Sequence, residues 1–195
     1  QFVSTVSHEL RTPLTSIKGS LDLINSGALG PVPTKMKGML EMASKNALRL
    51  SILINDVLDL QKIEAGQMRF RSNIVNVNDI VCESVASNQG LTRSYGVTIE
   101  EEMPNTAPLH IIGDEHRLIQ VISNMISNAA KFSAVGGRVQ VGCTYDAGKV
   151  RIFVRDNGIG IPEGVRDTVF DRFSQINSSD VRCVGGAGLG MNISK

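Results

Sequence analysis

The sequence has no excess of either charge, because 20 Lys and Arg residues stand against 19 Asp and Glu residues. Aromatic residues make up only 4% of the chain, and no basic run is interleaved with them. Surfaces that bind nucleic acid are usually strongly basic. We therefore expect no nucleic-acid partner.

Cysteine is scarce and long apolar runs are absent. Cys82, Cys143 and Cys183 lie far apart and show no paired metal-ligand spacing, which predicts reduced thiols rather than a disulfide framework or a zinc site. Polar residues interrupt the most apolar stretch, residues 50–60, whereas a helix that spans a membrane needs about 20 apolar residues. We expect no membrane contact within this fragment. The predicted location is cytoplasmic, either free or as the cytosolic part of a membrane-anchored receptor.

Apolar residues at alternating spacings of three and four predict two long helices at the start of the chain, over residues 1–27 and from Thr34 to about residue 63. Residues 30–33, Gly-Pro-Val-Pro, cannot continue a helix, and Thr34 is the expected N-cap of the second one. The helices would form an antiparallel hairpin whose uncovered apolar positions favour a four-helix bundle of two copies. A coiled-coil spacer without chemistry explains this pattern equally well.

Residues 7–14, Ser-His-Glu-Leu-Arg-Thr-Pro-Leu, place His8 opposite the apolar stripe of the first helix with Glu9 beside it. Thr12 lies one turn further along nearly the same face. An exposed imidazole next to a carboxylate can act as a nucleophile, although a lone surface histidine is far more often merely solvated. Pro13 removes a helical hydrogen bond one turn from His8 and predicts a kink there.

The pattern changes after residue 72 and predicts a second domain of helices on a sheet. The expected elements are helices over residues 78–94 and from Asp114, strands at 97–101 and 109–112, and a β-hairpin of 139–145 with 150–155. The predicted fold class is therefore α+β, with a helical hairpin over residues 1–72 and a mixed domain over residues 73–195.

Three clusters in the second domain have the composition of a nucleotide site. Asn124, Asn128 and Lys131 share one helix face, and their side chains suit a hydrated cation and a phosphate, although a solvated face explains them more simply when they are taken alone. Residues 156–162 hold an acid and two glycines after a strand, which fit either a flat ligand or a tight turn. Residues 185–190 open a helix with glycines that can present N–H groups to phosphate, at a spacing unlike that of the Rossmann or Walker motifs.

The order of these segments resembles the sensor histidine kinases of two-component signalling over essentially all 195 residues. That family carries an H box, an N box, a first glycine box, an F box and a second glycine box, which match residues 7–14, 124–131, 156–160, 170–173 and 186–190. The resemblance implies a dimeric four-helix bundle followed by an α/β sandwich of the GHKL (Bergerat) ATPase/kinase type.

The resemblance also implies the chemistry. His8 would accept the γ-phosphate of ATP, Glu9 would take the proton from its other ring nitrogen, and Thr12 would support dephosphorylation of the partner. Asn128 would be the ligand of Mg²⁺, and Asp156 would bind the adenine amino group. The full set expected to bind ATP comprises Asn124, Asn128, Lys131, Asp156, Gly158, Gly160, Gly186, Gly188, Leu189 and Gly190.

The implied function is autophosphorylation of His8 and transfer of the phosphoryl group to an aspartate of a response-regulator receiver domain, with response-regulator phosphatase activity as a further option. The chain departs from the family in carrying Ser174-Gln175 where some relatives have a basic residue, and in stopping at Lys195, so we expect a domain truncated at its C-terminus. A non-catalytic dimeric phosphotransfer or scaffold module with a degraded ATP site is one alternative. An ATPase that acts as chaperones or topoisomerases do is another.

Overall fold

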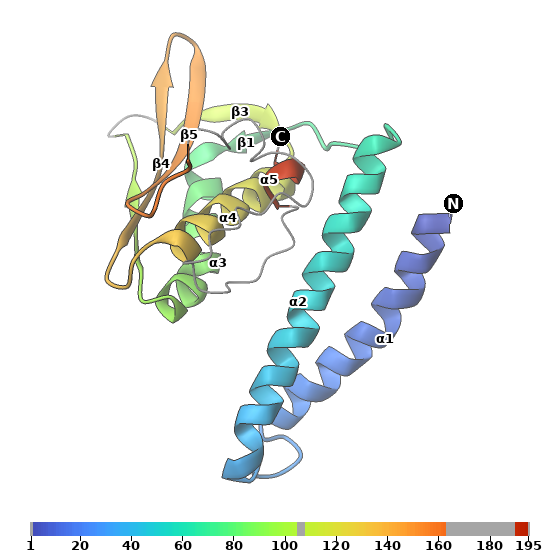
Figure 1. Ribbon diagram of the computed structural model, residues 1–195. Helices are drawn as coiled ribbons and strands as arrows, with labels where there is room; N and C mark the ends of the chain where they lie inside the picture. Colours follow the sequence, from blue (N-terminus) through green and yellow to red (C-terminus); the bar gives the residue numbers. More distant parts are fainter. Residues whose placement is uncertain (1, 105–107, 163–189, 195) are drawn as a thin grey trace. The chain divides into compact units, whose positions relative to one another are not determined.

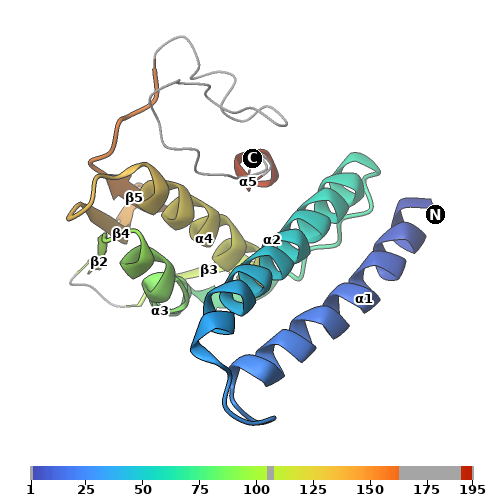
Figure 2. The ribbon, with the colours of Figure 1, turned by 60° about the horizontal axis from the view of Figure 1, so that its bottom comes forward.

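The computed structural model describes residues 2–104, 108–162 and 190–194, with side chains from residue 9 onward. The chain divides into two compact units, Gln1–Met68 and Arg69–Lys195. The first consists of helices, and the second combines helices with two small sheets (Figures 1 and 2).

The first unit is an antiparallel pair of helices, α1 (Phe2–Asn25) and α2 (Thr34–Glu64), which confirms the predicted hairpin. Gly27, with a φ of 76°, provides the left-handed backbone that turns the chain after α1. The predicted N-cap is wrong by one residue. Pro33 holds the cap position without a side-chain hydrogen bond, because its fixed φ suits the entry to a helix, and Thr34 is already helical.

The apolar stripe of α1 is only partly covered in a single copy of the hairpin. Leu14 is 5% exposed, whereas Leu10 and Ile17 on the same stripe are 47% and 52% exposed. One partner helix cannot bury a stripe this wide. Pro13 lies inside α1, and the helix continues beyond it to Asn25.

Within residues 69–104, 108–162 and 190–194, the second unit contains a ribbon of two strands and a sheet of three. The ribbon pairs β1 (Asn73–Asn76) antiparallel with β3 (His110–Gly113). The sheet has the order β2 (Thr98–Glu102), β4 (Arg138–Asp146) and β5 (Lys149–Asp156), with β2 parallel and β5 antiparallel to β4. The helices are α3 (Val77–Ser94), α4 (Glu115–Phe132) and the short α5 (Gly190–Ile193).

Helices α3 and α4 pack against each other and against one side of the three-stranded sheet (Figure 2). Alternate residues of β4 point into this layer, as expected for a strand with one covered face. The fully buried core includes Ile80, Val81, Ile126, Val139, Val141 and Cys143. Cys143 is thus a buried free thiol and Cys82 an exposed one, while Cys183 lies outside the described residues.

Two helix starts in this unit depend on side-chain caps. The helix start predicted at Asp114 is confirmed, and Asp114 caps α4, because its carboxylate accepts a hydrogen bond from the Arg117 amide at 3.3 Å. The start predicted for the helix over residues 78–94 is wrong by one residue, because α3 begins at Val77. Asn76 caps α3 by accepting from the Asn78 amide at 3.1 Å, because the preceding residues are already held in β1, a strand that the sequence pattern does not predict.

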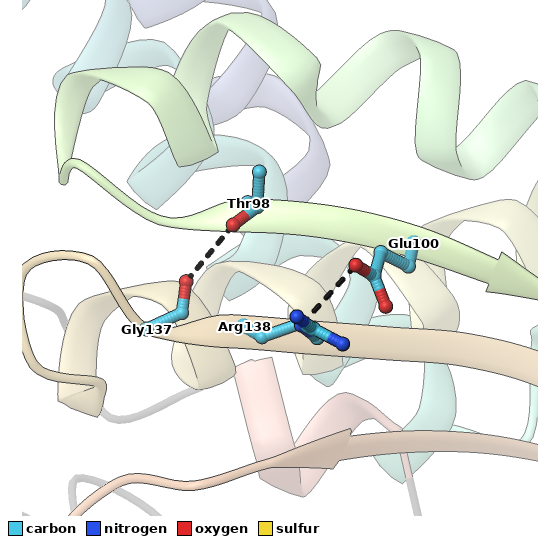
Figure 3. A network of polar contacts seen from close by, with 4 residues as sticks. All are labelled: Thr98, Glu100, Gly137 and Arg138. Carbon is cyan, nitrogen blue, oxygen red and sulfur yellow. Dashed lines mark hydrogen bonds and ion pairs between the residues drawn. The ribbon is translucent and has the colours of Figure 1, made fainter.

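The β4–β5 hairpin is confirmed, and it turns at Ala147 and Gly148, whose φ angles of 47° and 80° are those of a type I′ turn. Side chains also join β2 to the start of β4 (Figure 3). Arg138 Nε lies 3.1 Å from Glu100 Oε1, and the Thr98 hydroxyl donates to the Gly137 carbonyl at 3.2 Å. Both charged groups are exposed, so this ion pair stabilises the fold by no more than about 1 kcal/mol.

Candidate functional site

The polar face predicted on α4 is present in the structure. Asn124, Asn128 and Lys131 are all partly exposed, and they lie on the side of the helix opposite the buried Ile122 and Ile126. The Lys131 ammonium lies 4.9 Å from the centre of the Phe132 ring. This cation–π contact holds the charge beside the last turn of α4.

The turn that follows β5 is tied to the end of α4. Asp156 Oδ1 accepts a hydrogen bond from the Gly158 amide at 2.8 Å, and the Ile159 amide donates to the Phe132 carbonyl at 3.3 Å. A Cβ at Gly158 would lie 2.5 Å from that carbonyl oxygen and 2.8 Å from Asp156 Oδ1. Glycine is therefore required here for a close approach of two backbones. These contacts place the Asp156 carboxylate next to the C-terminal end of the α4 face that carries Asn128 and Lys131.

Helix α5 packs against α4. Asn124 Nδ2 donates to the Gly190 carbonyl at 3.2 Å and to the Ser194 hydroxyl at 3.5 Å. The final glycine of the expected second glycine box therefore meets the first asparagine of the expected N box. The predicted Gly186, Gly188 and Leu189 lie outside the described residues, as do residues 170–175.

The donor set of this region suits a hard cation that brings ligands of its own. Among residues 2–104, 108–162 and 190–194, no group of three His, Cys, Asp or Glu side chains could hold a metal ion. The α4 face offers instead the amide oxygens of two asparagines. Mg²⁺ is commonly held by few protein ligands together with substrate phosphates and water, so the residues present fit a magnesium ion that arrives with a triphosphate.

The expected phosphoacceptor segment lies in α1. His8 is in the helix, but its side chain lies outside what the structure describes, while Glu9 and Thr12 are exposed. The Arg11 guanidinium donates to Asn55 Oδ1 of α2 at 3.1 Å. This hydrogen bond brings the segment around His8 beside Asn55, a residue of α2 that the sequence analysis did not include in the site.

Asp56 is the second feature of α2 that the site prediction misses. Burial, with a smaller contribution from the nearby charge of Asp59, raises the pKa of Asp56 to about 6. The signal was present in the sequence, because Asn55, Asp56 and Asp59 interrupt an otherwise apolar run. Polar residues within an apolar run usually make a specific hydrogen bond when they are buried.

Two family models match the chain. The His Kinase A (phospho-acceptor) domain matches residues 1–66, and the histidine kinase-, DNA gyrase B- and HSP90-like ATPase matches residues 113–195. The second model is shared with enzymes that phosphorylate no histidine, so the first one is needed to tell the kinases apart.

Curated relatives match the whole chain. Hybrid signal transduction histidine kinase A of Dictyostelium discoideum is 33% identical over 205 residues, covering 100% of this chain and 9% of the relative. The circadian input-output histidine kinase CikA of Thermosynechococcus vestitus is 32% identical, covering 100% of this chain and 27% of the relative. The cell-division control histidine kinase PdhS of Brucella abortus is 32% identical, covering 100% and 20%. The chain thus spans less than a third of the length of these relatives.

Solved structures of histidine kinases share the fold. Full-length ShkA in complex with AMPPNP has a TM-score of 0.74 and 26% identity, covering 98% of this chain and 39% of that one. The Acinetobacter baumannii histidine kinase AdeS, at 23% identity and a TM-score of 0.63 over 96% of this chain and 83% of that one, shares the fold. Together with the two domain models and the curated relatives, these matches show that the chain belongs to the sensor histidine kinases of two-component systems, with a phosphoacceptor domain followed by an ATPase domain.

Proposed function

We propose that this chain binds ATP in its second unit, phosphorylates His8 and passes the phosphoryl group to an aspartate of a response-regulator receiver domain. The observation that carries the proposal is the Ile159–Phe132 hydrogen bond, which sets the Asp156 turn against the end of the α4 face that holds Asn128 and Lys131. A base-binding acid and a phosphate-binding face then lie within the reach of one nucleotide.

Asp156 would select the base. One of its carboxylate oxygens accepts the Gly158 amide, and the other would accept a hydrogen bond from the exocyclic amino group of adenine. Guanine presents a carbonyl oxygen at the equivalent position, and two acceptors repel each other. The site should therefore prefer ATP to GTP.

The α4 face would bind the triphosphate. Lys131 would offset phosphate charge, and the amide oxygens of Asn128 and Asn124 would face the accompanying cation. Mg²⁺, when bound there, would neutralise the negative charge that the phosphates carry. The glycine-rich segment would add N–H donors, and its described end at Gly190 already contacts Asn124.

In the chemical step, one ring nitrogen of neutral His8 attacks the γ-phosphorus, the N–P bond forms, and the bond to the ADP oxygen breaks. Glu9 accepts the proton from the other ring nitrogen, which makes the attacking nitrogen more nucleophilic. In the second step a receiver carboxylate attacks the same phosphorus and the imidazole leaves. Thr12, on nearly the same face as His8, would help to orient water when the receiver is dephosphorylated.

The partly exposed stripe of α1 supports pairing of two copies through the hairpin, because a four-helix bundle would bury Leu10 and Ile17. Within the described residues, none of the helices has the length and apolar content needed to cross a bilayer. We place the reaction in the cytoplasm, where ATP and receiver domains are available.

Incubation with γ-labelled ATP and Mg²⁺ tests the proposal. The label should be stable to alkali and lost in acid, as expected for a phosphoramidate, and it should vanish in His8→Gln while surviving in Ser7→Ala. A chain that acquires no label from ATP but does acquire it from another phosphorylated protein would be a phosphotransfer module. Sustained phosphate release without labelled protein would instead support an ATPase.

A further inference from the structure

The Asn124 side chain meets α5 through one end of its amide. Its Nδ2 lies 3.2 Å from the Gly190 carbonyl oxygen and 3.5 Å from the Ser194 hydroxyl oxygen. The Ser194 hydroxyl itself lies 2.8 Å from the same Gly190 carbonyl, which also accepts the Ser194 amide at 3.2 Å. The Gly190 carbonyl and the Ser194 hydroxyl, which bond each other, therefore both meet the Nδ2 end of this asparagine.

These neighbours determine which end of the amide faces α5. A carbonyl oxygen can only accept hydrogen bonds, so the Ser194 hydroxyl must spend its hydrogen on Gly190 and offers Asn124 a lone pair. Both atoms that meet the amide are thus acceptors. The NH₂ end has to face them, because the network decides the orientation of an asparagine amide. Nδ2 is therefore the end of the amide that bonds α5, and Asn124 Oδ1 takes no part in these hydrogen bonds.

We propose that Ser194 is a positioning residue, which orients the Asn124 amide so that its oxygen is presented to the cation that accompanies the nucleotide. The inference rests on the proposed function. Without the hydroxyl, one of the two acceptors that hold the NH₂ end is gone, and the amide can turn its hydrogens toward the cation. A hydrogen-bond donor in that place repels a metal ion.

Gly190 adds an independent way to disturb the same group. A Cβ on Gly190 would lie 3.3 Å from Asn124 Cγ, which is closer than most real contacts of this kind. Gly190→Ala would therefore press on the amide without removing a hydrogen-bonding atom, because the carbonyl of residue 190 remains. Both variants should disturb binding that depends on the cation, although they act by different routes.

The experiment titrates the chain with a fluorescent ATP analogue, once in Mg²⁺ and once in EDTA. Partners that orient a metal ligand are typically worth tenfold or more in metal affinity, so Ser194→Ala should weaken binding about tenfold in Mg²⁺ and less than about twofold in EDTA. Ser194→Thr, which keeps the hydroxyl, should restore the wild-type ratio. Ser94→Ala is a matched control, because the Ser94 hydroxyl also bonds a helix carbonyl, at 2.7 Å on Leu91, at the end of α3.

Two results would overturn the inference. Equal losses of affinity in Mg²⁺ and EDTA would mean that Ser194 only supports the structure, and no loss in either condition would mean that it does not orient Asn124. A wild-type chain that binds no nucleotide would instead contradict the proposed function. Circular dichroism melts of each variant identify any that fail to fold. If Ser194→Ala is among them, the second readout is the NMR signals of the Asn124 side-chain NH₂ in Ser194→Thr. Those signals should match the wild type, and a shift of Asn124 alone would contradict the inference.

Discussion

Arg11 and Asn55 join the two helices of the hairpin three residues after His8, with 3.1 Å between Nη2 of the arginine and Oδ1 of the asparagine. The bond lies next to Pro13, where the helix lacks one of its own hydrogen bonds. A second cross-helix bond, from Asn25 Nδ2 to Ser44 Oγ at 2.9 Å, lies near the turn of the hairpin. The middle and the C-terminal end of α1 are thus held to α2 by separate polar contacts.

The Arg11–Asn55 bond should be measurable by a double-mutant cycle of Arg11→Ala and Asn55→Ala. Both side chains are exposed, so the coupling free energy of unfolding should be about 0.5 to 1 kcal/mol. Urea denaturation of the four proteins measures it. Because Asn25 and Ser44 are remote, their substitutions should add to those of Arg11 without coupling. A coupling of zero within the Arg11–Asn55 pair would contradict the contact.

Gly158→Ala should weaken ATP binding by at least about tenfold, because an added methyl group cannot fit beside the Phe132 carbonyl and must break the Ile159–Phe132 bond, worth about 1 kcal/mol. Isothermal titration with ATP measures the loss. Gly90→Ala is the control, since a Cβ there meets nothing within 4 Å and the site is helical. That control should leave binding unchanged and stabilise the fold by up to about 1 kcal/mol. Equal affinities of the Gly158 variant and the wild type would refute the close approach.

Ile17→Glu should separate the paired copies. If the stripe is buried between copies, each lost side chain removes about 1.5 kcal/mol of apolar burial, or about 3 kcal/mol per dimer, so the dissociation constant should rise about 100-fold. Sedimentation velocity over a concentration series measures the change. Leu23→Glu is the matched control, because Leu23 is 48% exposed and lies opposite the buried Leu14 on the helix. Dimers that survive Ile17→Glu unchanged would place the interface elsewhere.

Asp56 should make the stability of the chain depend on pH. Its pKa is raised from the ordinary 3.8 to about 6 in the folded state, so the folded state holds the proton more tightly than the unfolded state does. The resulting contribution is complete below about pH 4 and is lost as the pH rises through 6. Asp56→Asn should flatten the change between pH 4 and 7 and should raise the free energy of unfolding at pH 7 by about 1 kcal/mol, a value reduced for partial exposure. Urea denaturation at pH 4, 5.5 and 7 tests this, and a variant with the wild-type slope would exclude Asp56 as the cause.

Local patterns were enough to predict the elements that have a strong period. An apolar period over eight or more residues runs through the helices of the hairpin and through α4. The β4–β5 hairpin has alternating strands and a turn that suits glycine. Strand β1 has four residues with asparagine at both ends, so it carries no such period. It exists because β3 pairs with it across 34 or more residues of sequence, as Asn76 does with His110. The parallel pairing of β2 with β4 likewise depends on distant chain segments.

The candidate site divides in the same way. The face shared by Asn124, Asn128 and Lys131 follows from helical geometry alone. The contact of Asn124 with Gly190 and Ser194 joins residues that are 66 and 70 positions apart, and no local rule predicts which end of an amide meets which acceptor. Asn55 stood out as polar within an apolar run, but its partner could be identified only from the packing of α1 on α2.

Asp114 serves two parts of the second unit with one carboxylate. It caps α4 through the Arg117 amide, and it accepts the Arg71 amide at 2.8 Å, near the point where the chain enters this unit. The Arg71 hydrogen bond is the main reason that the pKa of Asp114 lies below its ordinary value. Acidification should therefore loosen the entering segment and fray the first turn of α4 in a single event, so that the helix bearing the asparagines and the incoming chain are released together.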